Sequence, residues 1–325
     1  MNFRTPLPFE KSTIEISHES PLLCVGSCFA TNIGQKLEAA KFSTFVNPFG
    51  ISYNPVSIAE YLLYLIDNQL FTVDDIFQQG ELWHSFSHHG YFSKMSENET
   101  LEGINTTLKS ARDFFKTTQK IVITLGSANV FIYKKTGKIV ANCHKVPNLE
   151  FEKKRLSVDE IVGDLENILT RLKNKKPDLE VILSVSPIRH LREGIVENQR
   201  SKATLILATE ELCKKLDFVY YFPAYEIMMD DLRDYRFYET DMTHPTPQAV
   251  DYIWDIFQNI YFSEKTQTLT QRIERIVTAS KHRPFHTQSI DYQNFIKNSI
   301  AKIEALEVEF PSLDFKKERR IMLGG

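Results

Sequence analysis

Short apolar runs alternate with segments of helical periodicity through most of the chain. An apolar run of strand length followed by apolar residues at every third or fourth position is typical of a parallel β-α-β unit. The pattern predicts strands at residues 22–26, 42–47, 120–126, 180–185 and 218–221. It predicts helices at residues 30–37, 57–66, 101–116, 157–174, 199–215 and 248–261. The sequence therefore indicates an α/β fold with a mainly parallel central sheet.

Two further patterns stand outside this alternation. The β-prone runs 130–133 and 138–141 flank a Lys-Thr-Gly turn and predict a hairpin. Helical patterns at 268–279 and 289–307 predict a C-terminal appendage. We expect a main domain of residues 1–262 and a C-terminal helical extension of residues 263–325 packed on it.

The loops that follow parallel strands gather at one edge of a sheet, and ligands bind at that edge. Ser27 comes directly after the first strand and directly before a helix. A hydroxyl there lies near the positive end of the helix dipole, which favours a nucleophile or an anion. A serine that only caps the helix explains the same position, and this stretch alone does not separate the two interpretations.

A histidine and a carboxylate occur together near the end of the main domain. Asp241 and His244 are three residues apart in a turn, followed by Thr246 as a helix cap and Pro247 as the first helical residue. A serine needs a base to remove its proton, and that base is commonly a histidine oriented by a carboxylate. The alternative is that Asp241 binds local amides and His244 is an ordinary surface residue.

Gly26–Ala30 reads Gly-Ser-Cys-Phe-Ala and resembles the signature of the GSCFA family, which is similar to the SGNH (GDSL-like) hydrolases. Further segments resemble blocks of that family in the same order, and they lie at residues 47–50, 53–55, 124–126, 142–147, 184–187, 221–226 and 241–244. The resemblance implies a three-layer α/β/α fold in which Ser27 is the nucleophile, His244 the base and Asp241 its orienting carboxylate. It also implies that the amides of Ser27 and Gly50 bind the oxyanion.

The third block departs from the SGNH pattern. SGNH enzymes carry Gly-x-Asn-Asp there, and the asparagine side chain is an oxyanion donor; this chain has Gly126-Ser127-Ala128-Asn129. Asn129, Ser127 or Asn142 could supply the missing donor, and the sequence does not decide among them. Asn47, Gly126, Ser127, Asn142 and His144 are candidate pocket-lining residues.

Composition and charge restrict the function classes. Acidic residues outnumber basic ones by 42 to 39, so the chain has no general attraction for nucleic acid or anionic membranes. No run approaches the length of a membrane span, and the start lacks the features of a signal peptide, so we expect a cytoplasmic protein. The scattered cysteines are expected to be reduced core thiols.

Other charged and histidine-rich segments leave alternatives open. Arg189, His190 and Arg192 could attract an anionic substrate or form a solvated charge cluster. His84, His88 and His89 could bind a metal in a metal-dependent hydrolase, although they lack a neighbouring carboxylate or cysteine at ligand spacing.

The sequence thus predicts a serine hydrolase that removes an O-acyl group from a carbohydrate or another small metabolite, without metal or organic cofactor. The alternatives are an O-acyltransferase and a non-catalytic binding module that keeps the pocket. The oligomeric state does not follow from the sequence.

Overall fold

The computed structural model describes residues 5–282, 285–286 and 288–323. Its centre is a parallel sheet in the order β10-β9-β5-β1-β2. These strands are β1 (Leu22–Gly26), β2 (Thr44–Val46), β5 (Lys120–Leu125), β9 (Glu180–Val185) and β10 (Val219–Phe222). The predicted parallel α/β fold is confirmed, and β1, which ends one residue before Ser27, lies directly beside β5.

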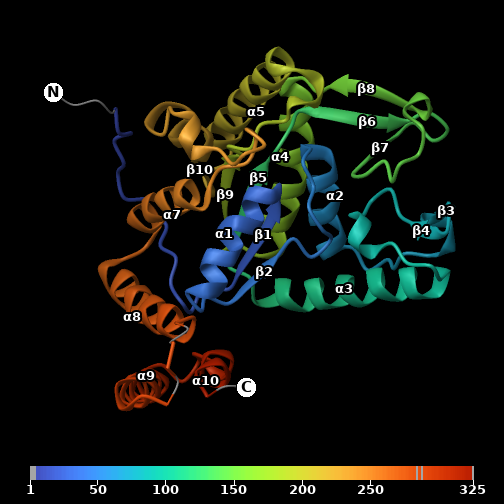
Figure 1. Ribbon diagram of the computed structural model, residues 1–325. Helices are drawn as coiled ribbons and strands as arrows, with labels where there is room; N and C mark the ends of the chain where they lie inside the picture. Colours follow the sequence, from blue (N-terminus) through green and yellow to red (C-terminus); the bar gives the residue numbers. More distant parts are fainter. Residues whose placement is uncertain (1–4, 283–284, 287, 324–325) are drawn as a thin grey trace.

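Helices cover both faces of this sheet (Figure 1). They are α1 (Cys28–Ala39), α2 (Pro55–Ile66), α3 (Glu97–Thr117), α4 (Val158–Lys175), α5 (Ile195–Lys215), the short α6 (Ala224–Glu226) and α7 (Pro247–Tyr261). Successive strand residues face opposite sides. Leu23 therefore packs in the cluster with residues of α2, α3, α4 and α5, whereas Leu22 packs in the cluster with residues of α1 and α7. The three-layer arrangement follows from this alternation.

Shorter strands lie outside the central sheet. They are β3 (Phe77–Gln79), β4 (Leu82–His84), β6 (Asn129–Tyr133), β7 (Lys138–Val140) and β8 (Phe151–Arg155). The predicted hairpin is confirmed as β6 and β7, and β8 adds an antiparallel third strand that the sequence pattern did not predict. Four of the five residues of β8 are exposed, so the segment carries no apolar alternation.

Three helices begin four residues before their predicted starts: α3, α5 and the C-terminal α8 (Glu264–Ser280), of which α3 and α5 belong to the main body. Helix α3 begins at Glu97, where the Ser96 hydroxyl caps it by accepting a hydrogen bond from the Glu99 amide. Helix α5 begins at Ile195, after Gly194 with a φ of 89°. The apolar pattern starts later than the helix in both segments, because the first turns are mostly exposed.

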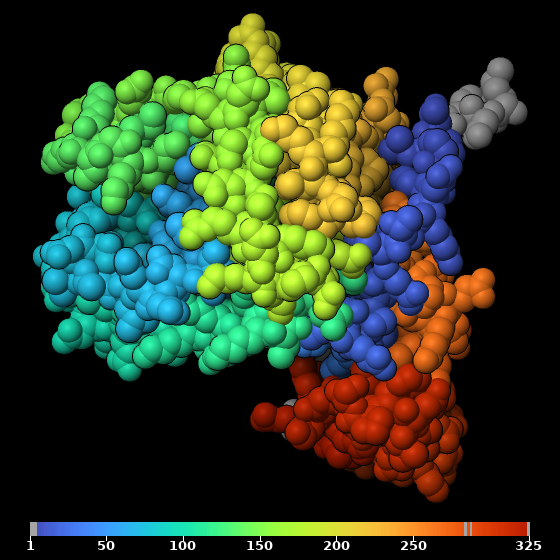
Figure 2. All heavy atoms as spheres, turned by 180° about the vertical axis from the view of Figure 1, so that it is seen from behind, coloured from blue at the N-terminus to red at the C-terminus, as the bar shows by residue number. Residues whose placement is uncertain are grey.

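The C-terminal helices form a separate cluster of buried side chains. They are α8 (Glu264–Ser280), α9 (Ile290–Glu309) and α10 (Lys316–Met322). The C-terminal residues project from the rest of the surface (Figure 2). An ion pair of 2.7 Å between Lys41 and Glu318 attaches α10 to the main body. No helix of the described residues is long and apolar enough to cross a membrane.

Candidate active site

Ser27 occupies a sharp junction between β1 and α1. The residue before it, Gly26, has a φ of 132°, and a Cβ on Gly26 would lie 2.2 Å from the Thr124 carbonyl oxygen, so only glycine fits. The Ser27 hydroxyl caps α1 by accepting a hydrogen bond of 3.3 Å from the Phe29 amide. Its side chain is fully buried. The strand thus ends in a serine at the N-terminus of a helix, as predicted, with its hydroxyl already engaged.

His244 and Asp241 form a compact pair in the turn before α7. His244 Nδ1 lies 2.6 Å from Asp241 Oδ2, and both side chains are about half exposed. The other carboxylate oxygen accepts hydrogen bonds from the amides of Thr243 and His244 at 2.8 and 3.0 Å. Hydrogen bonds from the backbone and the imidazole of His244 hold the pKa of Asp241 well below its usual range. The carboxylate therefore binds Nδ1 of the imidazole and leaves Nε2 as the nitrogen available for proton transfer.

The loop after β9 holds this turn against the sheet. The Arg189 amide donates to the Thr243 carbonyl at 3.1 Å, and the Arg189 guanidinium donates to the Met242 carbonyl at 2.9 Å. Arg189 is thus a structural link, and not a free cation for a substrate. Because β5 lies between β1 and β9, Ser27 and His244 are placed at the same edge of the sheet on opposite sides of β5.

The Ser27 hydroxyl and the His244 ring are not hydrogen-bonded to each other within the part of the chain that the structure describes. His190 lies between the two halves of the site. Burial, together with the charges of Lys202 and His244, lowers the pKa of His190 to about 3. Its ring packs edge-on against Tyr53 at 5.1 Å, and the Tyr53 hydroxyl lies 3.7 Å from the Cys28 sulfur beside Ser27.

The two predicted oxyanion amides have partners in this structure. The Ser27 amide donates to the Thr124 carbonyl at 3.0 Å, which continues the β1–β5 ladder by one residue. The Gly50 amide donates to the Asn47 carbonyl at 2.8 Å and closes a turn. Neither amide is therefore free to bind an oxyanion in this conformation. Both interactions depend on the tertiary register, which the sequence does not specify.

Two residues directly after β5, Gly126 and Ser127, bind the loop that contains Tyr53. The amides of Gly126 and Ser127 both donate to the Tyr53 carbonyl, each at 2.8 Å. The Asn47 side chain likewise supports the scaffold, because it accepts from the Gly26 amide at 2.8 Å and donates to Thr31 at 2.9 Å. Gly126 and Asn47 therefore shape the edge of the sheet without lining the cavity beside it.

A cavity of about 760 Å³ opens next to these residues. Six of the residues in its wall are Tyr53, Ser127, Asn129, Asn142, His144 and His190. The structure thus brings Ser127, Asn129, Asn142 and His144 together, whereas Ser27, Asp241 and His244 are not part of the cavity wall. Arg192 also lines it, with a long hydrogen bond of 3.4 Å to Asn148 and its guanidinium over the Phe131 ring. Lys145 is a second cation of the wall, and amides together with these cations suit a polar or anionic small molecule.

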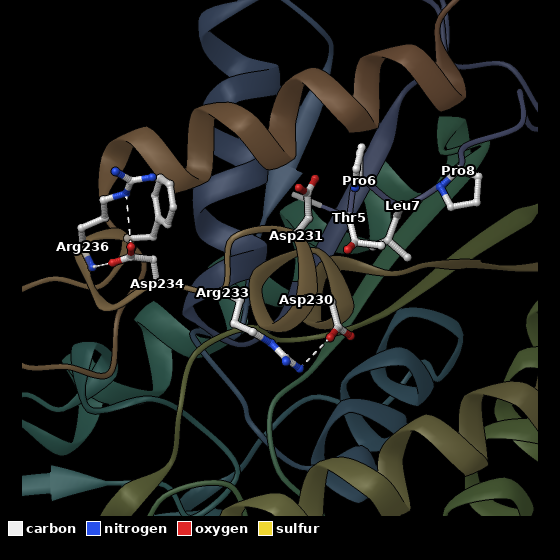
Figure 3. A pocket seen from close by; sticks show the side chains of 10 residues that line it. Thr5, Pro6, Leu7, Pro8, Asp230, Asp231, Arg233, Asp234 and Arg236 are labelled. Atoms are coloured by element: carbon white, nitrogen blue, oxygen red, sulfur yellow. Dashed lines mark hydrogen bonds and ion pairs between the residues drawn. The ribbon is translucent and has the colours of Figure 1, made fainter. Parts of the chain in front are cut away.

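A second hollow, of about 570 Å³, lies between residues 5–8 and residues 230–237 (Figure 3). Its charged side chains include the ion pairs Arg233–Asp230 and Arg236–Asp234. None of the predicted site residues lines it, so the chemistry of the sheet edge is separate from this hollow.

The histidine-rich loop uses its rings in packing and hydrogen bonds. His84 Nδ1 lies 2.6 Å from the Ser93 hydroxyl, His88 Nδ1 lies 3.0 Å from the Ser85 hydroxyl, and His89 Nδ1 accepts from the Tyr91 amide at 3.2 Å. Within the described ranges, no group of three or more histidine, cysteine, aspartate or glutamate side chains could hold a metal ion. The described residues therefore give no support to the alternative of a metal-dependent hydrolase.

Sequence reasoning missed one buried group at this edge, Lys202 of α5, whose ammonium contacts the ends of β5 and β9. A signal was present: Lys202 is one helical turn before Leu205, on the face that the apolar pattern predicts to be buried.

Together these features define an α/β protein with a serine and an aspartate–histidine pair at the carboxyl edge of a parallel sheet. The chain belongs to the GSCFA family, whose model matches residues 21–257. A model described as the GSCFA domain protein, C-terminal domain, matches residues 273–323.

Solved structures with a similar fold share little sequence. A protein provisionally described as a platelet activating factor from Streptococcus pneumonia is 14% identical, with a TM-score of 0.38 over 76% of this chain and 85% of that one. The acetyl xylan esterase Est2A from Butyrivibrio proteoclasticus is 11% identical, with a TM-score of 0.38 over 78% of this chain and 66% of that one. No curated protein sequence matches the chain.

Proposed function

We propose that this protein is a serine esterase that removes an O-acyl group from a carbohydrate or another small metabolite. Ser27 is the nucleophile, His244 the general base and acid, and Asp241 the carboxylate that orients His244. The observation that carries the proposal is the contact of 2.6 Å between His244 Nδ1 and Asp241 Oδ2, in a turn that Arg189 holds at the edge of the sheet where β1 delivers Ser27.

The reaction follows from these roles. Ser27 Oγ attacks the acyl carbon while its proton passes to His244 Nε2, and the same proton then leaves with the alcohol as the C–O bond breaks. Water, activated by His244, hydrolyses the acyl-enzyme and restores Ser27. An acceptor alcohol in place of water makes the same site an O-acyltransferase.

Substrate binding must rearrange the serine. Its hydroxyl has to give up the Phe29 amide at 3.3 Å and turn towards His244. This rearrangement frees the Phe29 amide, in the first turn of α1, as a donor for a developing oxyanion. Asn129 and Ser127, in the wall of the cavity, are candidate further donors, and the alcohol part of the substrate occupies that cavity.

A fluorophosphonate tests this function directly, because it labels only a serine activated by a base. We expect labelling of the wild type at Ser27, and loss of labelling in Ser27→Ala and His244→Gln. Ser186→Ala is the matched control, since Ser186 is another buried serine just beyond a central strand, and it should label normally. Absence of labelling in folded wild-type protein, together with no ester turnover, would reject the esterase.

A binding module is the second candidate, and one observation favours it: the hydroxyl and the amide of Ser27 are both engaged and the side chain is fully buried. It predicts that a carbohydrate or small metabolite binds in the 760 Å³ cavity with no turnover at any pH. Ester turnover that disappears in Ser27→Ala eliminates this candidate.

We also propose the division into a main domain of residues 1–262 and a helical extension of residues 263–325. The separate cluster of buried side chains in α8, α9 and α10 supports this division. Limited proteolysis that yields a stable fragment ending near residue 262 tests it.

A further inference from the structure

The inward face of α5 changes character along its length. Its buried residues recur at helical spacing and are Asn198, Ser201, Lys202, Leu205, Ala208, Thr209 and Leu212. The apolar members pack against the sheet, as an amphipathic helix requires. The first three are polar and are buried at the end of the helix nearest the candidate active site. Polar groups at buried helix positions need specific partners there.

Lys202 is the most costly of these polar groups to bury. Its side chain is only 1% exposed, and its Nζ donates hydrogen bonds of 2.7 Å to the Gly126 carbonyl and 2.7 Å to the Ser186 carbonyl. Among the ion pairs of the described residues, none joins a carboxylate to Lys202. Burial accordingly lowers the pKa of Lys202 to about 7. A neutral amine retains two N–H donors, so both hydrogen bonds persist in either protonation state.

The neighbours of Lys202 bind the same two loops. The Ser201 hydroxyl accepts a hydrogen bond of 2.8 Å from the Ala128 amide, in the loop after β5. The Asn198 side chain accepts one of 2.8 Å from the His190 amide, in the loop after β9. Lys202 alone contacts both loops, because Gly126 follows β5 and Ser186 follows β9.

These two loops lead to the two halves of the proposed catalytic apparatus. The Ser27 amide is bound to Thr124, two residues before Gly126. Arg189, three residues after Ser186, holds the turn that carries His244. Hydrogen bonds and short chain segments therefore connect Ser27 to the turn of His244. The contacts of Lys202 with Gly126 and Ser186 join the β5 side of this connection to the β9 side.

The ladder between β5 and β9 ends with the Ser186 amide, which donates to the Leu125 carbonyl at 2.8 Å. We propose that Lys202 is a positioning residue that sets the separation of Ser27 and His244 by fastening to each other the two loops beyond this point. This proposal rests on the proposed esterase function for its kinetic consequence. Its structural consequence, a displaced His244 turn when Lys202 is removed, does not depend on activity.

The test compares Lys202→Met with Lys120→Met. Methionine has a similar length and fills the same space without a donor. Lys120 is a matched control because it is a second buried lysine. It is the first residue of β5, at the edge of the sheet opposite to the candidate active site, where it pairs with Glu180. We record the ring resonances of His244 and His190 by NMR, and kcat, KM and the rate of fluorophosphonate labelling on the same samples.

We expect Lys202→Met to shift the His244 ring resonances and to lower kcat and the labelling rate by about 10- to 100-fold with little change in KM, because a misplaced base affects the chemical step and not binding. Lys120→Met should leave all of these unchanged. Should Lys202→Met not fold, Lys202→Gln, which keeps a donor on a shorter side chain, is measured in the same way.

The outcomes separate the two proposals. Unchanged His244 resonances in Lys202→Met overturn the positioning role, whether or not the wild type is active. Shifted resonances in a protein that never labels at Ser27 support the positioning role and reject the esterase. Shifted resonances together with the loss of kcat support both.

Discussion

His88 is a buried histidine whose replacement should change how the stability of the protein depends on pH. Its ring lies among aromatic rings, with centroids 4.7 Å from Phe71, 5.3 Å from Phe92 and 6.2 Å from Phe49. Nδ1 contacts the Ser85 hydroxyl at 3.0 Å, and Nε2 is buried without a hydrogen-bond partner in the described part of the chain. Burial, with repulsion from His144, lowers the pKa of His88 to about 3 from 6.5.

The sign of the effect follows from proton binding. Between pH 6.5 and 3 the unfolded chain binds a proton at this histidine and the folded protein does not, so stability is complete above pH 6.5 and is lost as the pH falls. At pH 5 the loss is about 2 kcal/mol, because in the unfolded chain the protonated histidine outnumbers the neutral one about thirtyfold, whereas the folded ring stays neutral. His88→Phe should abolish this loss, since phenylalanine suits the aromatic surroundings and does not titrate.

Urea unfolding at pH 7 and pH 5 measures this difference. We expect the wild type to lose about 2 kcal/mol more than His88→Phe between the two pH values. His282→Phe is the control, because His282 is exposed and also contacts an aromatic ring, Phe295. An equal loss in the wild type and His88→Phe would refute the argument that this ring is held neutral by burial.

Three further predictions concern single substitutions. Asp241→Asn should lower ester turnover by about 10²- to 10⁴-fold, because the imidazole loses its orienting carboxylate, and steady-state kinetics measures this. The unfolding midpoint at neutral pH should fall, because the hydrogen bonds that depress the pKa of Asp241 stabilise the folded protein. Gly26→Ala should destabilise the protein by about 3 kcal/mol or more, since its Cβ would lie 2.2 Å from the Thr124 oxygen. Gly163→Ala, in the middle of α4 with no atom near its Cβ, should instead raise stability by roughly 0.5–1 kcal/mol. Denaturant unfolding of the two glycine variants checks both signs, and a stable Gly26→Ala would contradict the close-approach argument.

The central strands could be predicted because each is an apolar run that must be buried on both faces. Residues 180–185 form β9 as the sequence indicates. The exposed strand β8 could not be predicted, because its residues Glu152–Arg155 face solvent and it pairs with β6, about 20 residues earlier in the chain. Helix starts were misplaced where the first turn lacks buried apolar residues at helical spacing: the first turn of α3 is polar, and Ile195 and Val196 at the start of α5 are exposed.

The sequence predicted where the candidate site residues lie in the fold, but not which hydrogen bonds they form. Local rules place Ser27 at a helix start and Asp241 beside His244, since these depend on neighbouring residues only. The partners of the Ser27 and Gly50 amides depend on the tertiary arrangement of the chain around them. That arrangement cannot be predicted from a single sequence. Lys202 was overlooked because a lysine in a helix is ordinarily solvated.

Residues 124–128 are joined to the rest of the molecule at almost every position: Thr124 to Ser27, Gly126 and Ser127 to Tyr53, and Ala128 to Ser201. A chain segment fixed at each step cannot absorb a change in its length. One residue inserted or deleted there would break the register of three loops at once, whereas the exposed turn at residues 135–137 has room for additional residues. The architecture thus separates a segment of fixed length at the edge of the central sheet from a neighbouring loop whose length is free to vary.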